Sequence, residues 1–134
     1  MIGLARKFMV LAVLSALAGM VWGIQMAISH DHALSPAHAH LNLLGWVMLA
    51  LFAVYYHVVP DAAESRLARV HFAVALLSVV TIVPGIVLAL TGVSEAVAAL
   101  GAFLTLGSMA LFAAAVLRGA GAEGTAGRLS RAPH

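Results

Sequence analysis

The sequence predicts an all-α membrane protein with four transmembrane helices. Of its 134 residues, 63% are hydrophobic and only 9% are charged, whereas a soluble domain carries about 25% charged residues. Four apolar stretches are each long enough to cross a hydrocarbon core, which needs about 20 helical residues, and none of them contains Asp, Glu, Lys or Arg. Backbone groups in lipid must be satisfied within their own segment, so we expect these stretches to be helices.

The four predicted helices follow one another with short connections, which is typical of one domain. Their expected ranges are Phe8–Ile28, Leu41–Val59, Val70–Leu90 and Ala96–Leu117. Between the last two helices, Thr91–Glu95 is predicted to be a tight turn in which Ser94 caps the fourth helix. We therefore expect a transmembrane domain at 1–117, followed by a flexible cytoplasmic tail at 118–134 that is rich in Gly and Ala.

The first predicted helix carries small residues on one face. Ser15, Gly19 and Gly23 stand four residues apart, and this spacing lets helix backbones approach closely in lipid. Packing within one bundle is the favoured interpretation, with a dimer face as the alternative.

The start of the chain also has features of a cleavable signal peptide. Arg6 and Lys7 precede an apolar stretch that includes Ala16-Leu17-Ala18. The apolar run continues to Ile28, however, and this length favours a permanent transmembrane helix.

The distribution of basic residues predicts the orientation of the bundle. All seven fall on one side of the predicted topology, namely Arg6, Lys7, Arg66, Arg69, Arg118, Arg128 and Arg131. The positive-inside rule then places both termini in the cytoplasm of a bacterial inner membrane and the loop before the second helix on the periplasmic side.

Composition excludes several classes of function. The chain has no cysteine, so disulfides, cysteine-based zinc sites and iron–sulfur clusters are excluded. The basic residues do not cluster on an amphipathic soluble surface, so a nucleic-acid partner is not expected. The expected surroundings are lipid and further copies of the chain.

Seven histidines stand out in so apolar a chain. His30, His32, His38 and His40 fall at the predicted outer face, His57 and His71 at the inner face, and His134 ends the sequence. Ionisable residues at membrane depth are expensive and indicate function. His57 and His71 lie at predicted helix ends, where we expect headgroups and water to satisfy them.

His38 and His40 cannot bind one ion together while both are helical. Residues two apart on a helix point about 200° away from each other, so each of these imidazoles needs a partner from another helix or subunit. His38 shares a face with Asn42 and Gly45, where the glycine would let a flat ring lie against the backbone and the amide could orient a ligand.

The other face of this helix is apolar. His40 shares it with Leu44, Val47 and Leu51, a lining that suits a porphyrin whose iron takes neutral imidazole as axial ligand. Ordinary packing explains the same pattern. A copper or zinc site is a further alternative, because imidazole suits both metals. Its candidate ligands are His30, His32, His38 and His40.

The stretch HAHLNLLGWVMLALFAVYY resembles the catalytic subunit of heme-copper oxidases and nitric oxide reductases, and short bacterial chains described as subunit-I-like. His40-Leu41-Asn42-Leu43-Leu44 is similar to the His-x-Asn-Leu-Leu pattern of the family's second helix, whose histidine binds the low-spin heme. His38-Ala39-His40 has the spacing of a His-x-His in its tenth helix, whose histidines bind two hemes on opposite faces.

This resemblance implies an assembly. The family's subunit I has twelve helices in three arcs of four, so a four-helix chain is similar to one arc and implies a homotrimer. The implied cofactor is heme b, with His38 and His40 as ligands contributed by adjacent subunits, for electron transfer to a redox partner that is not identified. The chain lacks the family's three-histidine copper set, so stand-alone oxygen reduction is not expected. A cofactor-free assembly subunit is a further alternative, and transport is a weaker one.

Overall fold

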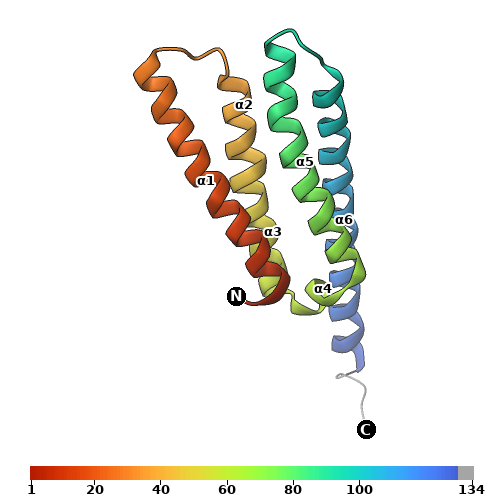
Figure 1. Ribbon diagram of the computed structural model, residues 1–134. Helices are drawn as coiled ribbons and strands as arrows, with labels where there is room; N and C mark the ends of the chain where they lie inside the picture. The colour runs from red at the N-terminus through yellow and green to blue at the C-terminus, as the bar shows by residue number, and fades with distance from the viewer. Residues whose placement is uncertain (130–134) are drawn as a thin grey trace.

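The computed structural model describes the backbone of residues 1–129 and the side chains of residues 1–119. This part of the chain is helical and contains no β-strand. Its elements are α1 (Gly3–Ser29), α2 (Ser35–His40), the π-helix η1 (Leu41–Met48), α3 (Leu49–Val58), α4 (Pro60–Glu64), α5 (Arg66–Leu90) and α6 (Ala96–Leu129). The elements α2, η1 and α3 follow one another without a break and form one rod (Figure 1).

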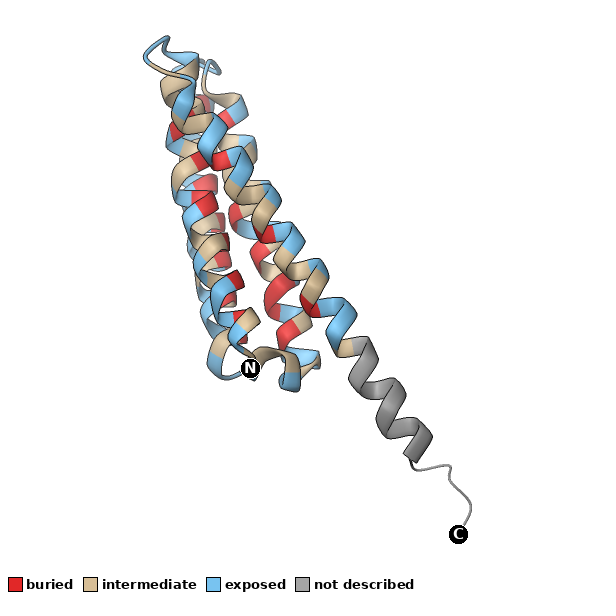
Figure 2. Cartoon of the chain, turned by 90° about the vertical axis from the view of Figure 1, so that its right-hand side faces the viewer, coloured by how far each residue is buried: buried red, intermediate tan, exposed pale blue. Residues whose placement is uncertain are grey.

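Four helical segments are long and apolar enough to cross a membrane, which makes the chain a multi-pass membrane protein. They are Gly3–Ser29, Ser35–Val58, Arg66–Leu90 and Ala96–Gly119. Buried residues lie on their inward sides, while the outward sides carry exposed residues (Figure 2), many of them large and apolar. This distribution is expected of helices that face lipid.

The helices are longer than predicted: α1 begins at Gly3 rather than Phe8, α5 begins at Arg66 rather than Val70, and two further boundaries differ more. The second segment begins at Ser35 rather than Leu41, because Pro36 fits the first turn of a helix, where its missing N–H is not needed. Helix α6 continues to Leu129, beyond the predicted end of the span. Residues 130–134, including His134, lie outside the described residues, and the flexibility of the tail stays a prediction.

The two ends of the bundle have different chemistry. One end, here called the basic end, carries five exposed bases: Arg6, Lys7, Arg66, Arg69 and Arg118. The other end, here called the histidine end, carries the loop after α1 and the turn between α5 and α6 (Figure 1). Alternation of the helices therefore separates the described bases from His30, His32, His38 and His40.

Serine side chains accept hydrogen bonds from backbone N–H groups at the start of the last two long helices. The Ala68 N–H donates to Ser65 Oγ at 3.0 Å, and the Ala96 N–H donates to Ser94 Oγ at 3.2 Å. The second bond confirms the predicted cap. Between α3 and α5, where a loop was expected, Pro60 begins the short helix α4.

Helices α5 and α6 approach closely at two glycines. A Cβ added at Gly85 would lie 2.6 Å from the Ala98 backbone nitrogen, and one added at Gly101 would lie 2.7 Å from Ile82 Cβ. Real Cβ atoms do not come this close, so only hydrogen fits between the helices at these points. Small residues of this kind replace hydrophobic burial as the source of helix association in lipid.

We predict opposite effects for alanine at two glycines of α6. Gly101→Ala is expected to lower the free energy of unfolding by about 1–3 kcal/mol, because the methyl group overpacks the contact with α5. Gly107→Ala is the matched control, since a Cβ there meets nothing within 4 Å, and it should be neutral or stabilise by up to about 1 kcal/mol. Unfolding of detergent-solubilised protein by added SDS measures both, and equal effects would contradict the assigned contact.

Candidate functional site

His38 faces the first helix. Its imidazole stands edge-on to Trp22, with ring centroids 6.1 Å apart and an interplanar angle of 83°. A Cβ added at Gly23 would lie 3.3 Å from His38 Cε1, so the ring rests against the α1 backbone. The imidazole is half-buried. The glycine spacing predicted to pack within the bundle thus forms the surface that receives His38.

Asn42 occupies a second notch in α1. Its Nδ2 donates to the His38 carbonyl oxygen at 3.0 Å, and the same nitrogen lies 3.3 Å from His38 Nε2. A Cβ added at Gly19 would come 2.8 Å from Asn42 Nδ2. The amide is therefore held between α1 and the preceding turn, and its main bond is to backbone.

Gly45 continues this contact. A Cβ added there would lie 2.9 Å from both Cβ and Oγ of Ser15, and Gly45 is buried. His38, Asn42 and Gly45 share one face, as predicted, but that face packs against α1. The expectation that Gly45 leaves room for a flat ring is wrong within this chain, because Ser15 fills the space.

A π-helix begins directly after His40. In this form hydrogen bonds run from i to i+5, so the register shifts relative to an α-helix. The Asn42 side chain takes the His38 carbonyl, the acceptor that an α-helix would give to Asn42's own N–H. We assign the widened turn to this competition. Such turns are rare and frequent at functional sites.

The three apolar residues predicted to share a face with His40 differ in exposure. Leu44 is half-buried and lines a small cavity together with residues of α5 and α6, whereas Val47 and Leu51 are 39% and 58% exposed. The π-helix from Leu41 to Met48 departs from the uniform α-helical period behind the prediction, and the apolar wall stays a prediction.

The His40 side chain is held by a backbone carbonyl one turn earlier in the same helix. Its Nδ1 donates to the Pro36 carbonyl oxygen at 2.8 Å. A carbonyl can only accept, so Nδ1 carries the proton and Nε2 of the neutral ring keeps its lone pair. Both His38 and His40 lie in α2, and their side chains leave that helix about 200° apart.

The loop histidines remain in solvent. His30 ends α1 with φ 56°, and both His30 and His32 are exposed. The loop is organised by its own bonds, since the Ala33 N–H donates to Asp31 Oδ1 at 2.9 Å and Ser35 Oγ donates to the His32 carbonyl at 2.8 Å. Among the described residues, no three His, Asp or Glu side chains gather as a metal-binding group.

His71 is placed differently from what its position predicted. We expected water and headgroups to satisfy it, but its side chain is 0% exposed. Helix α5 begins five residues before it, and aromatic side chains from three other helices close over the ring. The centroids of Phe8, Phe52 and Phe112 lie 5.3, 4.5 and 5.6 Å from that of the imidazole. His57, by contrast, is exposed as expected.

A single hydrogen bond holds this buried ring. His71 Nδ1 and the Tyr56 hydroxyl are 2.9 Å apart, and Nε2 has no partner among the described residues. If Tyr56 donates to Nδ1, the proton is on Nε2, and the Nε2–H is the one polar group of the pair without a hydrogen-bond partner. The surrounding aromatic faces are weak acceptors for it. If His71 donated instead, both the hydroxyl proton and the Nε2 lone pair would lack partners. We therefore assign Tyr56 as the donor.

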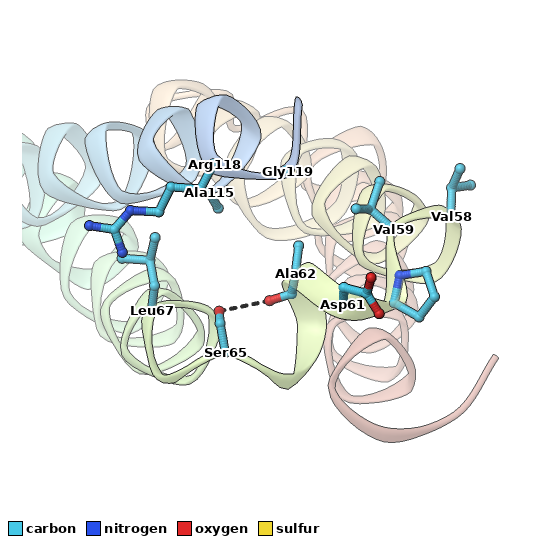
Figure 3. Close-up of a pocket in the computed structure, with 10 residues that line it drawn as sticks. Val58, Val59, Asp61, Ala62, Ser65, Leu67, Ala115, Arg118 and Gly119 are labelled. Carbon is cyan, nitrogen blue, oxygen red and sulfur yellow. Dashed lines mark hydrogen bonds between the residues drawn. The ribbon is translucent and has the colours of Figure 1, made fainter. Parts of the chain in front are cut away.

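A hollow at the basic end is separate from the predicted site. It has a volume of about 260 Å³ and lies where the end of α3, α4, the start of α5 and residues 115–119 of α6 meet. Figure 3 shows Asp61 and Arg118 on opposite sides of it, and the bond in which Ser65 Oγ donates to the Ala62 carbonyl at 2.7 Å. Because His38 and His40 lie at the other end, this cavity does not extend their site.

Comparisons with known proteins assign no family. The sequence matches no protein-family model and no curated protein, and the structure matches no solved structure. The resemblance to subunit I of heme-copper oxidases therefore rests on the short motif around His38 and His40 and on the presence of four helices.

The Tyr56–His71 pair predicts a strong coupling. Tyr56→Phe should lower the free energy of unfolding by about 1–3 kcal/mol, because it leaves a buried imidazole nitrogen unpaired, and His71→Phe should strand the hydroxyl at similar cost. The double variant removes both partners, so its loss of unfolding free energy should be smaller than the sum of the losses in the two single variants. Unfolding in SDS-containing micelles measures the cycle.

His57→Phe is the matched control for this cycle. Its ring is exposed at the same end of the bundle, so its stability should stay within about 0.5 kcal/mol of the parent. If the losses of unfolding free energy in Tyr56→Phe and His71→Phe added up to the loss in the double variant, the two side chains would make no bond in the membrane protein.

Proposed function

We propose that this protein binds a b-type heme at its histidine end, through imidazole ligands contributed by adjacent copies, and that it serves electron transfer. The observation that carries the proposal is the bond from His40 Nδ1 to the Pro36 carbonyl at 2.8 Å. Histidines that bind metals usually donate their other ring nitrogen in this way, which fixes the tautomer and the orientation of the ring. The Pro36 carbonyl thus orients His40 so that its Nε2 is available as a nitrogen ligand.

His38 is the second candidate ligand, and its surroundings are different. Its ring lies against α1. The two ring nitrogens are 3.3 and 3.4 Å from Asn42 Nδ2, and hydrogen bonds of this length are too long to hold the ring firmly. An imidazole is a donor that heme iron accepts, and the His38 ring is half-buried beside Trp22 and Asn42. We rank His40 above His38 because its ring has the shorter and better defined bond.

A second copy of the chain is part of the proposal. His38 and His40 leave α2 on different sides, and the described residues contain no group of three or more His, Cys, Asp or Glu that could hold a metal. A cyclic assembly uses two different surfaces of each subunit, so one copy can offer His38 and its neighbour His40. The resemblance to one four-helix arc supports a trimer. Two imidazoles would fill both axial positions of the iron, which suits electron transfer rather than gas binding.

The polar groups of a heme fit less well than its iron. Arginine and lysine are absent from the described histidine end, and Ser29 and Ser35 already donate to carbonyl oxygens of Met26 and His32. The exposed imidazoles of His30 and His32 are the groups left to meet the propionates. The proposal therefore rests on the axial ligand.

The proposed orientation follows from charge. The five described bases lie at one end of the bundle, and the positive-inside rule places that end in the cytoplasm of a bacterial inner membrane. The histidine end then faces the periplasm, where a redox partner would dock. Copper or zinc binding is the less favoured alternative, because His30, His32, His38 and His40 do not form a group within the chain.

Absorption spectroscopy of the detergent-solubilised protein, expressed with ample heme, tests the proposal. We expect a Soret band that is lost in His40→Ala and reduced or shifted in His38→Ala, because each loses an axial imidazole. His57→Ala is the matched control, since that histidine is exposed at the opposite end, and its spectrum should be unchanged.

The contradicting outcomes are specific. A colourless protein in which both variants assemble like the parent would support the cofactor-free alternative. Copper or zinc that is lost in a His30→Ala/His32→Ala variant would support the metal alternative. A Soret band of equal intensity in His40→Ala would remove the residue on which the proposal depends.

A further inference from the structure

A continuous apolar groove runs between α1 and α5. One hollow of about 540 Å³ lies near the basic end, and another of about 450 Å³ lies further along the same seam. Leu11 and Leu76 line both, so the two hollows join. Figure 1 shows α1 and α5 leaning apart toward the histidine end, in contrast to α5 and α6, which glycines bring into close contact.

The mouth of this groove carries two positive charges. Arg6 and Lys7 line it at the basic end together with Val10 and Phe72. Both bases are exposed, and neither makes an ion pair or side-chain hydrogen bond within the described residues. Leu11 stands four residues after Lys7, about 6 Å further along the helix axis. The groove therefore changes from cationic to apolar over about one helical turn.

We propose that this groove binds an anionic phospholipid, with the headgroup phosphate against Arg6 and Lys7 and an acyl chain along Leu11 and Leu76. Interfacial bases attract anionic headgroups, and the apolar walls match a hydrocarbon chain. A transmembrane helix of another copy would leave both cations without a partner. A zwitterionic lipid would bring an ammonium group toward two like charges, so the charge pattern favours a lipid with net negative charge.

Native mass spectrometry of the full chain in detergent micelles tests this site, with palmitoyl-oleoyl phosphatidylglycerol as the probe and phosphatidylcholine as the comparison. We expect phosphatidylglycerol to bind more tightly. The double variant Arg6→Gln/Lys7→Gln should lose about tenfold or more in affinity, since two interfacial charges are removed. Leu76→Trp should cause a similar loss by filling the groove while leaving its charge unchanged.

Each variant has a matched control elsewhere on the bundle. Arg66→Gln/Arg118→Gln removes two exposed bases of the same end that do not line the groove. Leu77→Trp places the same bulk on a neighbouring position of α5 that is 51% exposed and lies outside the groove. Both should bind phosphatidylglycerol within about twofold of the parent. Circular dichroism confirms helicity, and Leu11→Phe replaces Leu76→Trp if that variant is unfolded.

Any of four results would overturn the proposal. If Arg6→Gln/Lys7→Gln and Arg66→Gln/Arg118→Gln lost affinity for phosphatidylglycerol equally, the lipid would be attracted to the basic end as a whole rather than to a site. Equal binding of phosphatidylglycerol and phosphatidylcholine would remove the charge selectivity. Displacement of the lipid by free glycerol phosphate would show that the acyl chain does not occupy the seam, and so would full binding in the groove-filling variant that folds.

Discussion

Close contact between helix backbones at glycine organises this bundle. In lipid, burying apolar side chains gives little advantage, so association depends on how closely the helices can pack. Gly19 and Gly45 bring α1 against the second segment, and Gly85 and Gly101 bring α5 against α6. The chain is thus two tightly packed helix pairs, and the seam between α1 and α5 stays open enough to form a groove.

The two helix pairs are joined where aromatic side chains meet. Phe8, Phe52, Tyr56 and Phe112 come from α1, α3 and α6, and they surround His71 of α5. A polar ring enclosed in this way must find a partner inside the protein, and the Tyr56 hydroxyl provides one. This interior bond connects α3 with α5 and gives the basic half of the bundle a defined packing.

The glycine contacts between α1 and the second segment set the properties of the histidine end. Packing against α1 engages His38, Asn42 and Gly45, which leaves His40 as the imidazole with an oriented, unengaged nitrogen. The Asn42 side chain bonds to the His38 carbonyl, and the helix widens into a π-helix from Leu41. Among the described residues, no three His, Cys, Asp or Glu side chains gather around this end as a metal-binding group, and for this reason the proposed heme site draws on a second copy of the chain.

Composition and apolar run length were enough to predict four membrane helices, the positions of the bases predicted their separation from His38 and His40 along the bundle, and the helical period predicted the opposed directions of these two imidazoles. These features follow from local periodicity and from the absence of charge in each span. The burial of His71, the filling of the Gly45 face by Ser15 and the altered register after His40 could not be predicted in this way. Each depends on which side chain of a distant helix arrives at that position, and contacts between helices are not encoded in the period of any one of them.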